Sequence, residues 1–426
     1  MSEILMLIGK ILVGFTYLYY FFIIFFGIIG LFIKKKPSVP YSETGRELRT
    51  AVVICARNED KVIGNLIDSL KEQNYPKDKI CIFVVAHNCT DSTKQTSLEH
   101  GAVVYERNEP KDTCKGQALN WGISQIQNDY PDYFESVVFF DADNIAGRNF
   151  IYEINKALEN GADIAQGYRA SKNHNTNIIT KLFAVFWIYV IRFHSMPIAK
   201  AGLGGMVSGT GFAVKMSALS EESWLTYTML EDVEFSVQHI MKGHTIDVAE
   251  NAIFYDEQPT KLGDALTQRY RWSIGGTQLM KRYLLQVLKF TFGHFGIGIR
   301  LLFDVCCNLF IFSGIIGEAL VIASMLLSPM TLSEVLLSLS ISLLRSCILL
   351  MLPVIGSILC ERISFKENIV TILLFPAYMA LSFVFGFISF FDTDIKWKPI
   401  PHIDTTRLEQ LERLEEHKND TTSPHR

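Results

Sequence analysis

Residues 11–33 form an apolar stretch without a single charged side chain. A helix of this length rises roughly 35 Å, which is enough to cross the hydrocarbon core of a bilayer. The stretch is too long for the core of a signal peptide, and Lys34, Lys35 and Lys36 follow it where a cleavage site would need small residues. Because lysines gather on the cytosolic side of membrane helices, the apolar stretch and the lysines after it predict a membrane helix that places the following chain in the cytosol.

Three more apolar segments, near 301–327, 335–360 and 369–391, follow a long polar middle and predict further membrane helices. The first two contain ionisable residues, which are costly at membrane depth and usually face protein or water. Two interpretations stay open for them, pairing between helices and the lining of a polar conduit. These residues are Asp304, Glu318 and Arg345.

The side of the membrane on which the C-terminal tail lies is ambiguous from the sequence. Three crossings from a cytosolic middle would leave the tail outside, whereas its basic residues favour the cytosol. An interfacial segment at 283–298 would reconcile the two. From about Asp404 the tail is charged and polar, and we expect a frayed, solvated helix there. The basic residues are Lys396, Lys398, Arg407 and Arg413.

Composition excludes several classes of protein. The chain has 426 residues, of which 49% are hydrophobic and 20% charged, so it is neither disordered nor a small disulfide-bonded domain. The chain has a formal net charge of −4 and so lacks the excess of basic residues that is typical of nucleic-acid-binding proteins. We therefore expect no nucleic-acid partner. The eight cysteines form no CxxC pair, and we interpret them as reduced thiols of a cytosol-facing protein.

The middle of the chain alternates short apolar runs with amphipathic stretches, the pattern of strands that are separated by helices. It predicts an α/β domain whose mostly parallel sheet is covered by helices on both faces. In such sheets, ligands bind beyond the carboxyl ends of the strands. The predicted strands are 51–56, 80–86, 102–105 and 137–141, and the predicted helices are 60–73, a stretch from Asp91, and 115–126.

Polar side chains gather where these strands end. Asp141 and Asp143 directly follow a buried strand, where alternate carboxylates can hold a hard divalent cation and leave positions for water and phosphate. Many such triplets are surface turns, but the preceding strand favours metal binding. Lys115 begins a helix after a loop, where its ammonium could meet an anion, although a surface lysine is the commoner case.

Two later segments carry further candidate groups. Asp232 lies in the acidic first turn of an amphipathic helix, where it either caps the helix or acts as a general base. Gln268, Arg271 and Trp272 fall on one face of another predicted helix, at positions i, i+3 and i+4. They offer a hydrogen-bond donor, a guanidinium for phosphate and a stacking plane, or alternatively only an interfacial anchor.

Five short motifs follow one another along the chain: ARNED at 56–60, HNCTD at 87–91, DAD at 141–143, LED at 230–232 and QRYRW at 268–272. In this order they resemble the motifs of membrane-embedded family 2 glycosyltransferases, which include cellulose, hyaluronan and chitin-oligosaccharide synthases. The resemblance covers roughly residues 11–285 and the general layout of the C-terminal helices. It implies a GT-A fold and inverting sugar transfer from a nucleotide diphosphate sugar, with a uridine nucleotide favoured.

The resemblance also implies roles on the donor side. Glu59 and His87 would contact the nucleobase, and Asp91, which matches the family, would contribute to donor binding. The family commonly has aspartate at the position of His87, but a neutral imidazole can still accept a hydrogen bond at one ring nitrogen. Lys115 and Asp141 would lie near the ribose and the diphosphate.

The remaining roles concern the metal and the acceptor. Asp143 would hold Mg²⁺ or Mn²⁺, and Asp232 would take the proton from the acceptor hydroxyl. Gln268 and Arg271 would contact the acceptor or the diphosphate, and Trp272 would stack under the acceptor sugar. Because no side-chain nucleophile flanks the site, single displacement with inversion is favoured.

We therefore expect a multi-pass enzyme of the cell membrane with a cytosolic catalytic domain. It would be a hexosyl- or N-acetylhexosaminyltransferase that extends a polysaccharide or oligosaccharide, with or without coupled export. The alternative is a non-processive enzyme that adds one sugar to a lipid carrier. The predicted parts are a membrane helix at 1–36, the catalytic domain at 45–262, QxxRW and interfacial helices at 263–298, membrane helices at 299–391 and a polar tail at 392–426.

Expected partners are the nucleotide sugar donor, a saccharide or lipid-linked acceptor, membrane lipids, and a second copy or an export protein. Two other classes are disfavoured. A transporter with a nucleotide-sensing domain would need more than four spans and paired hydropathy halves. A dehydrogenase would need a GxGxxG turn after the first strand, and the sequence has none there.

Overall fold

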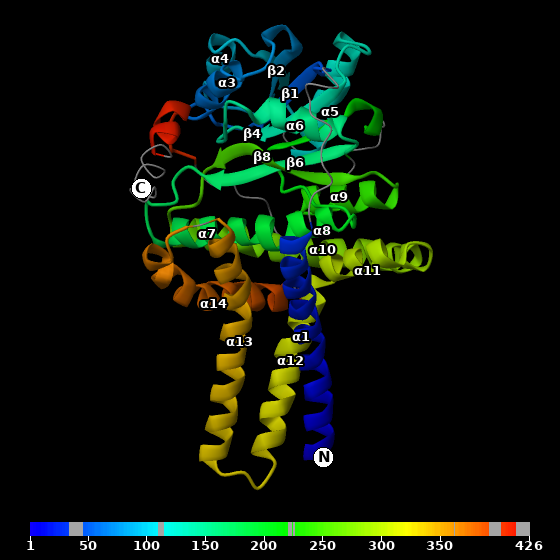
Figure 1. Ribbon diagram of the computed structural model, residues 1–426, viewed down its shortest axis with the longest axis vertical. Helices are drawn as coiled ribbons and strands as arrows, with labels where there is room; N and C mark the ends of the chain where they lie inside the picture. The colour runs from blue at the N-terminus through cyan, green and yellow to red at the C-terminus, as the bar shows by residue number, and fades with distance from the viewer. Residues whose placement is uncertain are drawn as a thin grey trace.

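The computed structural model describes residues 1–33, 46–109, 115–219, 224, 226–361, 363–391 and 402–414. An α/β domain lies at one end of the long axis, and a bundle of long helices extends away from it (Figure 1). The lysine cluster at 34–36 lies outside the described residues, as do Lys396 and Lys398 of the predicted basic tail.

A mixed eight-stranded sheet with the order β3-β2-β1-β4-β7-β6-β8-β5 forms the centre of the α/β domain. β3, β2, β1 and β4 are parallel, which confirms the four strands and the parallel arrangement expected from the sequence. β7 runs antiparallel between β4 and β6, and the sequence analysis did not predict β5 to β8. The bounds are β1 Thr50–Ala56, β2 Ile80–His87, β3 Val103–Arg107, β4 Ser136–Asp141, β5 Ile145–Ala146, β6 Ile164–Ser171, β7 Phe212–Lys215 and β8 Ile246–Asp256.

Helices cover both faces of the sheet, because its central strands are apolar on both sides. Val52 and Ile54 of β1 belong to the core that includes α3 and α6, while Ala51 and Val53 belong to the core that includes α5, α9 and α10. The carboxyl ends of β1, β2 and β4 therefore meet at one edge of a packed core. The helix bounds are α3 Ile63–Lys71, α4 Thr93–Glu99, α5 Lys115–Asp129, α6 Phe150–Glu159, α9 Glu231–Met241, α10 Leu262–Gly293 and α11 Phe295–Val305.

Three long helices run side by side along the long axis in Figure 1: α1 Ser2–Phe32, α12 Cys307–Leu326 and α13 Leu332–Cys360. α1 and α12 come close together at small residues, since a Cβ at Gly9 would lie 2.8 Å from the carbonyl oxygen of Gly317. Thr16 of α1 also donates a hydrogen bond of 2.6 Å to the carbonyl of Phe310. Such close packing at small residues is typical of membrane helices.

Glu318 of α12 and Arg345 of α13 face each other, with 3.9 Å between a carboxylate oxygen and a guanidinium nitrogen. Ser342 donates a further hydrogen bond of 2.7 Å to Glu318. This is the interhelical pairing that the sequence left as one of two interpretations. Asp304 lies outside these long helices, in α11, where Arg300 is 3.2 Å away.

In the described part of the chain, five helices are long and apolar enough to cross a membrane, where the sequence analysis expected four. The additional one spans Ile178–Lys200 and consists of α7 Ile178–Tyr189, the π-helical turn η2 Val190–Ser195 and α8 Met196–Lys200. Charged residues inside it, Lys181 and Arg192, interrupt the apolar run and explain why it was missed. α7 lies across the bundle beneath the sheet, and so does α14 Phe365–Ile388, which was expected to be a third C-terminal crossing (Figure 1).

The chain after α14 returns to the α/β domain. Leu408 and Leu411 are buried against Ile145 and Tyr255, so residues 402–414 are packed and not the frayed, solvated end that we expected. These residues therefore lie on the same side as the sheet. α14 lies across the bundle in Figure 1, although its length and composition alone would also allow a crossing.

We expect the α12–α13 connection and the C-terminal segment to lie on opposite sides of the membrane. In a variant without native cysteines, a single cysteine at the exposed Ser333 should react with a membrane-impermeant maleimide from one side only. A cysteine at the exposed Glu409 should react only from the other side. Permeabilised membranes, in which both react, are the control. Labelling of both positions from the same side of sealed vesicles would contradict three crossings.

Candidate active site

A cavity of about 360 Å³ opens at the carboxyl ends of β1, β2 and β4. Its lining includes Arg169, Asp256, Glu257 and His402, which the sequence analysis did not single out. A larger hollow of about 1140 Å³ lies elsewhere, by α6, α8 and α11, and contains none of the predicted site residues. The predicted residues that line the smaller cavity are Glu59, His87, Lys115, Asp141, Asp143, Gln268 and Arg271, whereas Asp91, Asp232 and Trp272 are not part of the lining.

Asp141 ends β4 and is fixed from two directions. Its backbone N–H donates to the Thr210 hydroxyl at 2.8 Å, and Lys115 Nζ lies 2.5 Å from its Oδ1. Lys115 also donates to the carbonyl of Gly209 at 2.8 Å. Burial would lower the pKa of Lys115, but Asp141 and Glu231 outweigh it and raise the pKa. Lys115 is therefore a firm positive charge at the cavity wall, which suits a diphosphate.

Asp143 is buried, with only 4% of its surface exposed. Burial raises its pKa to about 7, and the carboxylates of Asp256 and Asp141 add to this effect, while His402 and Lys172 oppose it. Converging carboxylates repel one another unless a cation joins them, so these side chains fit a divalent cation. Within the described ranges, no group of three or more His, Cys, Asp or Glu side chains could hold a metal ion, so a cation at Asp143 would need further oxygen ligands from substrate phosphates.

Two buried ion pairs support the adjacent wall. Arg169 of β6 and Asp256 of β8 form one, with 2.7 Å between Nη2 and Oδ2, and Asn144 donates to the other oxygen of Asp256 at 2.8 Å. Lys172 and Glu257 form the second, with 3.3 Å between their charged atoms. Polar residues follow the apolar run of β8 just as they follow that of β4, so this signal was present in the sequence and was overlooked.

α10 brings Gln268 and Arg271 to the cavity. Burial lowers the pKa of Arg271, although a guanidinium stays charged because its reference pKa is far above neutrality. Gln268 lines the cavity, and its Oε1 is buried and has no hydrogen-bond partner among the described residues. Trp272 packs instead against Phe186, with the ring centroids 5.8 Å apart. Its role under an acceptor sugar stays a prediction.

Glu231 and Asp232 begin α9, and only Glu231 lines the cavity. Asp232 lies against the loop at Gly209, where a Cβ would come within 3.2 Å of its Oδ2 and where φ is +80°. The Val233 N–H donates to Oδ1 of Asp232 at 2.8 Å. Burial raises the pKa of Asp232 to about 7, and the charge of Glu231 adds to it. A carboxylate with such a pKa suits a general base near neutral pH.

Two of the predicted donor-binding residues, on β2 and beyond it, differ in their surroundings. His87 ends β2, is 4% exposed, and accepts at Nδ1 from Arg107 at 3.3 Å. Asp91 accepts hydrogen bonds from the Thr93 N–H at 3.0 Å and the Thr93 hydroxyl at 2.6 Å. Burial would raise the pKa of Asp91, but these bonds outweigh it and lower the pKa. Asp91 thus orders the start of α4, and its direct contact with a donor stays a prediction.

His402 comes from the C-terminal segment and is the site residue that the sequence signalled least. Its Nδ1 lies 3.0 Å from Glu59 Oε1, and its Nε2 lies 3.8 Å from Asp143 Oδ2. Burial would lower the pKa of His402, but Asp143 and Glu59 outweigh it and raise the pKa to about 10. It lies in a polar stretch far along the chain from both acids, and no motif marks it.

If His87 contacts the nucleobase, replacing it by alanine should raise the donor KM with little change in kcat. One lost hydrogen bond of about 1 kcal/mol corresponds to a rise of roughly fivefold. Steady-state kinetics with varied donor measure both constants. His100→Ala, which removes an imidazole that pairs with Asp68 on the surface, is the matched control. An unchanged donor KM in His87→Ala would remove His87 from the donor site.

The mixed sheet with a cavity at the ends of its parallel strands, together with the family match over residues 48–275, defines the class of protein, a glycosyltransferase with the GT-A fold. Residues 48–275 match the family model for "Glycosyltransferase like family 2". This match spans more than half of the chain, which therefore belongs to that family, as the five motifs had suggested.

Curated relatives have low sequence identity to this chain but align with most of its length. A probable glycosyltransferase of Bacillus subtilis, YdaM, is 25% identical over 68% of this chain and 70% of its own length. The poly-beta-1,6-N-acetyl-D-glucosamine synthase of Staphylococcus aureus is 24% identical over 60% of this chain and 61% of its own length. The match thus spans about three fifths of the staphylococcal synthase.

A solved structure shares the fold over nearly the whole chain. The mannosyltransferase PcManGT from Pyrobaculum calidifontis, solved in complex with GDP-Man and Mn²⁺, matches with a TM-score of 0.60 and 16% identity. The match covers 90% of this chain and 98% of that one, so the likeness reaches beyond the α/β domain.

Proposed function

We propose that the protein is an inverting hexosyl- or N-acetylhexosaminyltransferase that moves a sugar from a UDP-sugar to a saccharide acceptor at the membrane. One observation carries the proposal: a single cavity brings together the strand-end carboxylates Asp141 and Asp143, the cations Lys115 and Arg271, and the unpartnered oxygen of Gln268. The nucleotide sugar in the complex of the fold neighbour and the polymer named for the staphylococcal relative support it.

The donor would lie along the carboxyl ends of β1, β2 and β4. Asp143, beside Asp141, would hold Mg²⁺ or Mn²⁺, which when bound neutralises charge on the departing diphosphate. Lys115 donates to diphosphate oxygens from the start of α5, and Arg271 does so from α10. His87, at the end of β2, would contact the nucleobase.

The acceptor would approach from the side of α9 and α10. Gln268 Oε1 accepts a hydrogen bond from an acceptor hydroxyl and orients it. Asp232 takes the proton of the attacking acceptor hydroxyl. At the same time, the oxygen of that hydroxyl bonds to the anomeric carbon, and the bond from this carbon to the diphosphate breaks. Attack opposite the leaving group inverts the configuration at that carbon.

The arrangement of the long helices in Figure 1 supports a membrane placement for the proposed enzyme. We place α1, α12 and α13 across the bilayer and α7, α14 and the α10–α11 corner along its cytosolic surface. The corner exposes apolar side chains, Leu285 at 71%, Phe292 at 95% and Phe295 at 75%, as expected of a segment in contact with lipid headgroups and acyl chains. The enzyme would then be a multi-pass protein of the cell membrane whose acceptor lies at the bilayer surface.

The product would be an extended polysaccharide or oligosaccharide. Glu318 and Arg345 pair with each other, so a polar export route would need a second copy of the chain or an export partner. The same pairing favours the second candidate function, transfer of one sugar to a lipid carrier, because that reaction needs no route through the bilayer. Proteoliposomes separate the two: product protected from an added glycosidase indicates export, and a digestible single-sugar lipid indicates the second function.

The proposal is tested by purifying the protein in detergent and screening UDP- and GDP-sugars for nucleotide release and product mass. We expect UDP release with one UDP-sugar in the presence of Mg²⁺ or Mn²⁺, and an inverted linkage in the product. Release of GDP alone would overturn the uridine assignment. Failure to release nucleotide from every donor, with a correctly folded protein, would overturn the proposed function.

A further inference from the structure

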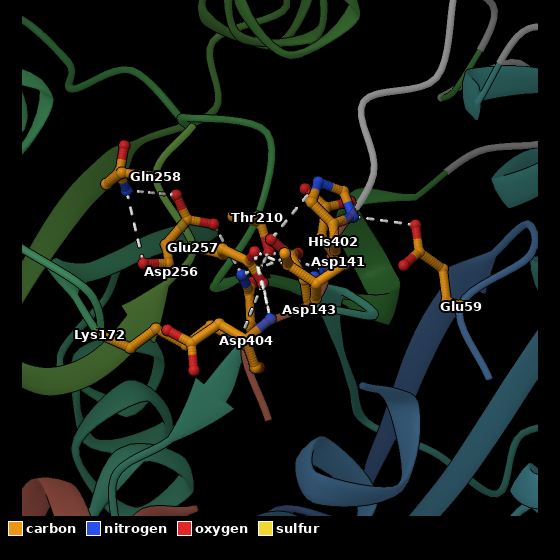
Figure 2. A network of polar contacts seen from close by, with 12 residues as sticks. Glu59, Asp141, Asp143, Lys172, Thr210, Asp256, Glu257, Gln258, His402 and Asp404 are labelled. Atoms are coloured by element: carbon orange, nitrogen blue, oxygen red, sulfur yellow. Dashed lines mark hydrogen bonds and ion pairs between the residues drawn. The ribbon is translucent and has the colours of Figure 1, made fainter. Parts of the chain in front are cut away.

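The lining of the cavity at the strand ends has two chemically different parts. Charged side chains such as Asp143, Asp256 and His402 gather in one part (Figure 2). The loop 227–229, which leads into α9, lines another part and contributes only uncharged side chains. This second part therefore suits a neutral ligand better than a diphosphate.

The backbone of this loop is held in place by α9 and α10. The buried carboxylate of Glu234 accepts hydrogen bonds from the backbone N–H groups of Tyr227 and Thr228, both at 2.8 Å. The backbone N–H of Met229 donates to Gln278 Oε1 at 3.0 Å. Because all three contacts use backbone groups, they fix the loop without engaging the side chains of Tyr227 and Thr228.

Two buried polar atoms of the lining have no hydrogen-bond partner in the described part of the chain, Thr228 Oγ1 and Gln268 Oε1. Thr228 is only 6% exposed. A buried polar atom without a partner is costly, and a bound ligand that pairs with it removes that cost. The hydroxyl groups of a sugar can do so at both positions, because a hydroxyl donates to the amide oxygen of Gln268 and also accepts from the hydroxyl of Thr228.

Tyr227 adds an aromatic surface beside these atoms, and within the described lining it has the one Phe, Tyr or Trp ring. The guanidinium of Arg282 lies over this ring, 3.9 Å from its centroid, and so occupies one face. Tyr227 is nevertheless 59% exposed, which leaves ring surface for a ligand. An aromatic face carries negative charge density and attracts the C–H bonds on the flat side of a pyranose.

The packing of Trp272 makes it a poorer stacking surface than Tyr227. Its ring lies against Phe183, Phe186 and Trp187, with centroid separations of 6.1, 5.8 and 5.7 Å. It is also absent from the lining of the cavity. A sugar would stack on Trp272 only after these rings had moved, whereas Tyr227 needs no such rearrangement.

We infer that the loop 227–229 is the acceptor subsite, in which Tyr227 stacks on the terminal pyranose of the acceptor and Thr228 binds one of its hydroxyl groups. The inference rests on the proposed function and deepens it, because it specifies an acceptor that already ends in a sugar. Stacking favours a pyranose with only axial C–H bonds on the stacked side, as in glucose and N-acetylglucosamine. A polyprenyl phosphate without a sugar offers no such surface.

Transfer kinetics with defined acceptors test the subsite. The full-length enzyme in detergent is given the UDP-sugar identified in the donor screen, with tetrasaccharides of glucose, N-acetylglucosamine or mannose as acceptors and polyprenyl phosphate as the sugar-free comparison. Tyr227→Ala should raise the acceptor KM about three- to tenfold and leave the donor KM unchanged. Tyr227→Phe, which keeps the ring, should stay close to the wild type.

Thr228→Val separates ligand binding from stability, because it removes the hydroxyl and nearly preserves the shape. The acceptor KM should rise about fivefold, as expected for one lost hydrogen bond. The melting temperature should not fall, since the hydroxyl has no partner in the described part of the chain. A fall in melting temperature with an unchanged acceptor KM would assign Thr228 to the fold and contradict its role in the subsite.

Tyr133→Ala is the matched control for Tyr227→Ala. Tyr133 is also exposed and has an arginine, Arg49, 4.9 Å from its ring centroid, but it lies outside the lining of the cavity. Its removal should leave the acceptor KM unchanged. An acceptor KM that is unchanged in Tyr227→Ala, or raised equally in Tyr227→Phe, would overturn the inference. Preference for the polyprenyl phosphate over every tetrasaccharide would overturn it as well.

Saturation-transfer NMR with the same tetrasaccharides gives a readout that needs no turnover. In the presence of UDP and Mg²⁺, the C–H protons of the terminal sugar should receive saturation from the wild type and lose it in Tyr227→Ala. Absence of this signal from every tetrasaccharide would overturn the inference. A wild type that transfers sugar independently of Tyr227 loses only this inference, whereas one that binds a tetrasaccharide through Tyr227 but releases no nucleotide from any donor loses the proposed function.

Discussion

Asp232→Asn should lower kcat by on the order of 10²–10⁴, because an amide cannot take the proton of the acceptor hydroxyl. Donor binding should change little, since Asp232 lies against the loop at Gly209 and not in the lining of the donor cavity. Initial rates of UDP release, together with equilibrium binding of UDP, separate the two effects. A large loss of UDP affinity would contradict the assignment.

The neighbouring carboxylate provides the matched control. Glu231 lines the cavity and its charge helps to raise the pKa of Asp232, so Glu231→Gln should lose less activity. In the wild type, kcat should fall as the pH is lowered through about 7, because the base is active only when deprotonated. Glu231→Gln should shift this fall to lower pH, since removal of a like charge lowers the pKa of Asp232. If Glu231→Gln is crippled and Asp232→Asn is mild, Glu231 is the base.

Asp143→Asn, or removal of divalent cations with EDTA, should lower the rate of transfer by on the order of 10²–10³. The physical reason is that a neutral amide binds Mg²⁺ or Mn²⁺ poorly and leaves the charge of the diphosphate uncompensated. Added Mg²⁺ or Mn²⁺ should restore the EDTA-treated wild type but not the variant. Rates of UDP release under each condition measure this.

Folding must be checked separately, because Asp143 is buried. Burial raises the pKa of Asp143 to about 7, so it already disfavours the charged form. A neutral asparagine should therefore change the free energy of unfolding little, and Asp143→Asn should melt close to the wild type. Asp68→Asn, which changes an acid on α3 that pairs with His100, is the control and should keep full activity. Full transfer in the presence of EDTA would remove the metal from the mechanism.

The sequence was sufficient to predict the half of the sheet in which pattern and pairing are local. β1, β2, β3 and β4 follow one another through short crossovers, and each ends in polar residues, so runs of apolar residues could be read directly as parallel strands. Most of the predicted donor-side residues line the cavity for the same reason: the carboxyl ends of parallel neighbours meet at one edge.

The other half depends on long-range pairing that periodicity does not encode. β7 is only Phe212–Lys215, too short to stand out, and it is inserted antiparallel between β4 and β6. Asp91 and Trp272 match motifs, yet local hydrogen bonds and aromatic packing, respectively, keep them out of the cavity lining. His402 is placed by contacts with distant residues such as Glu59, which no local pattern reveals.

The return of residues 402–414 to the α/β domain also sets an order of events during synthesis. A ribosome adds about 5–20 residues per second, so His402 appears on the order of ten seconds or more after Asp143 has been made. α12, α13 and α14 all lie between the two in the chain. The nascent α/β domain therefore still lacks one wall of its cavity at the strand ends until α12, α13 and α14 have been synthesised. The proposed enzyme would begin to consume nucleotide sugar only once α12, α13 and α14 exist.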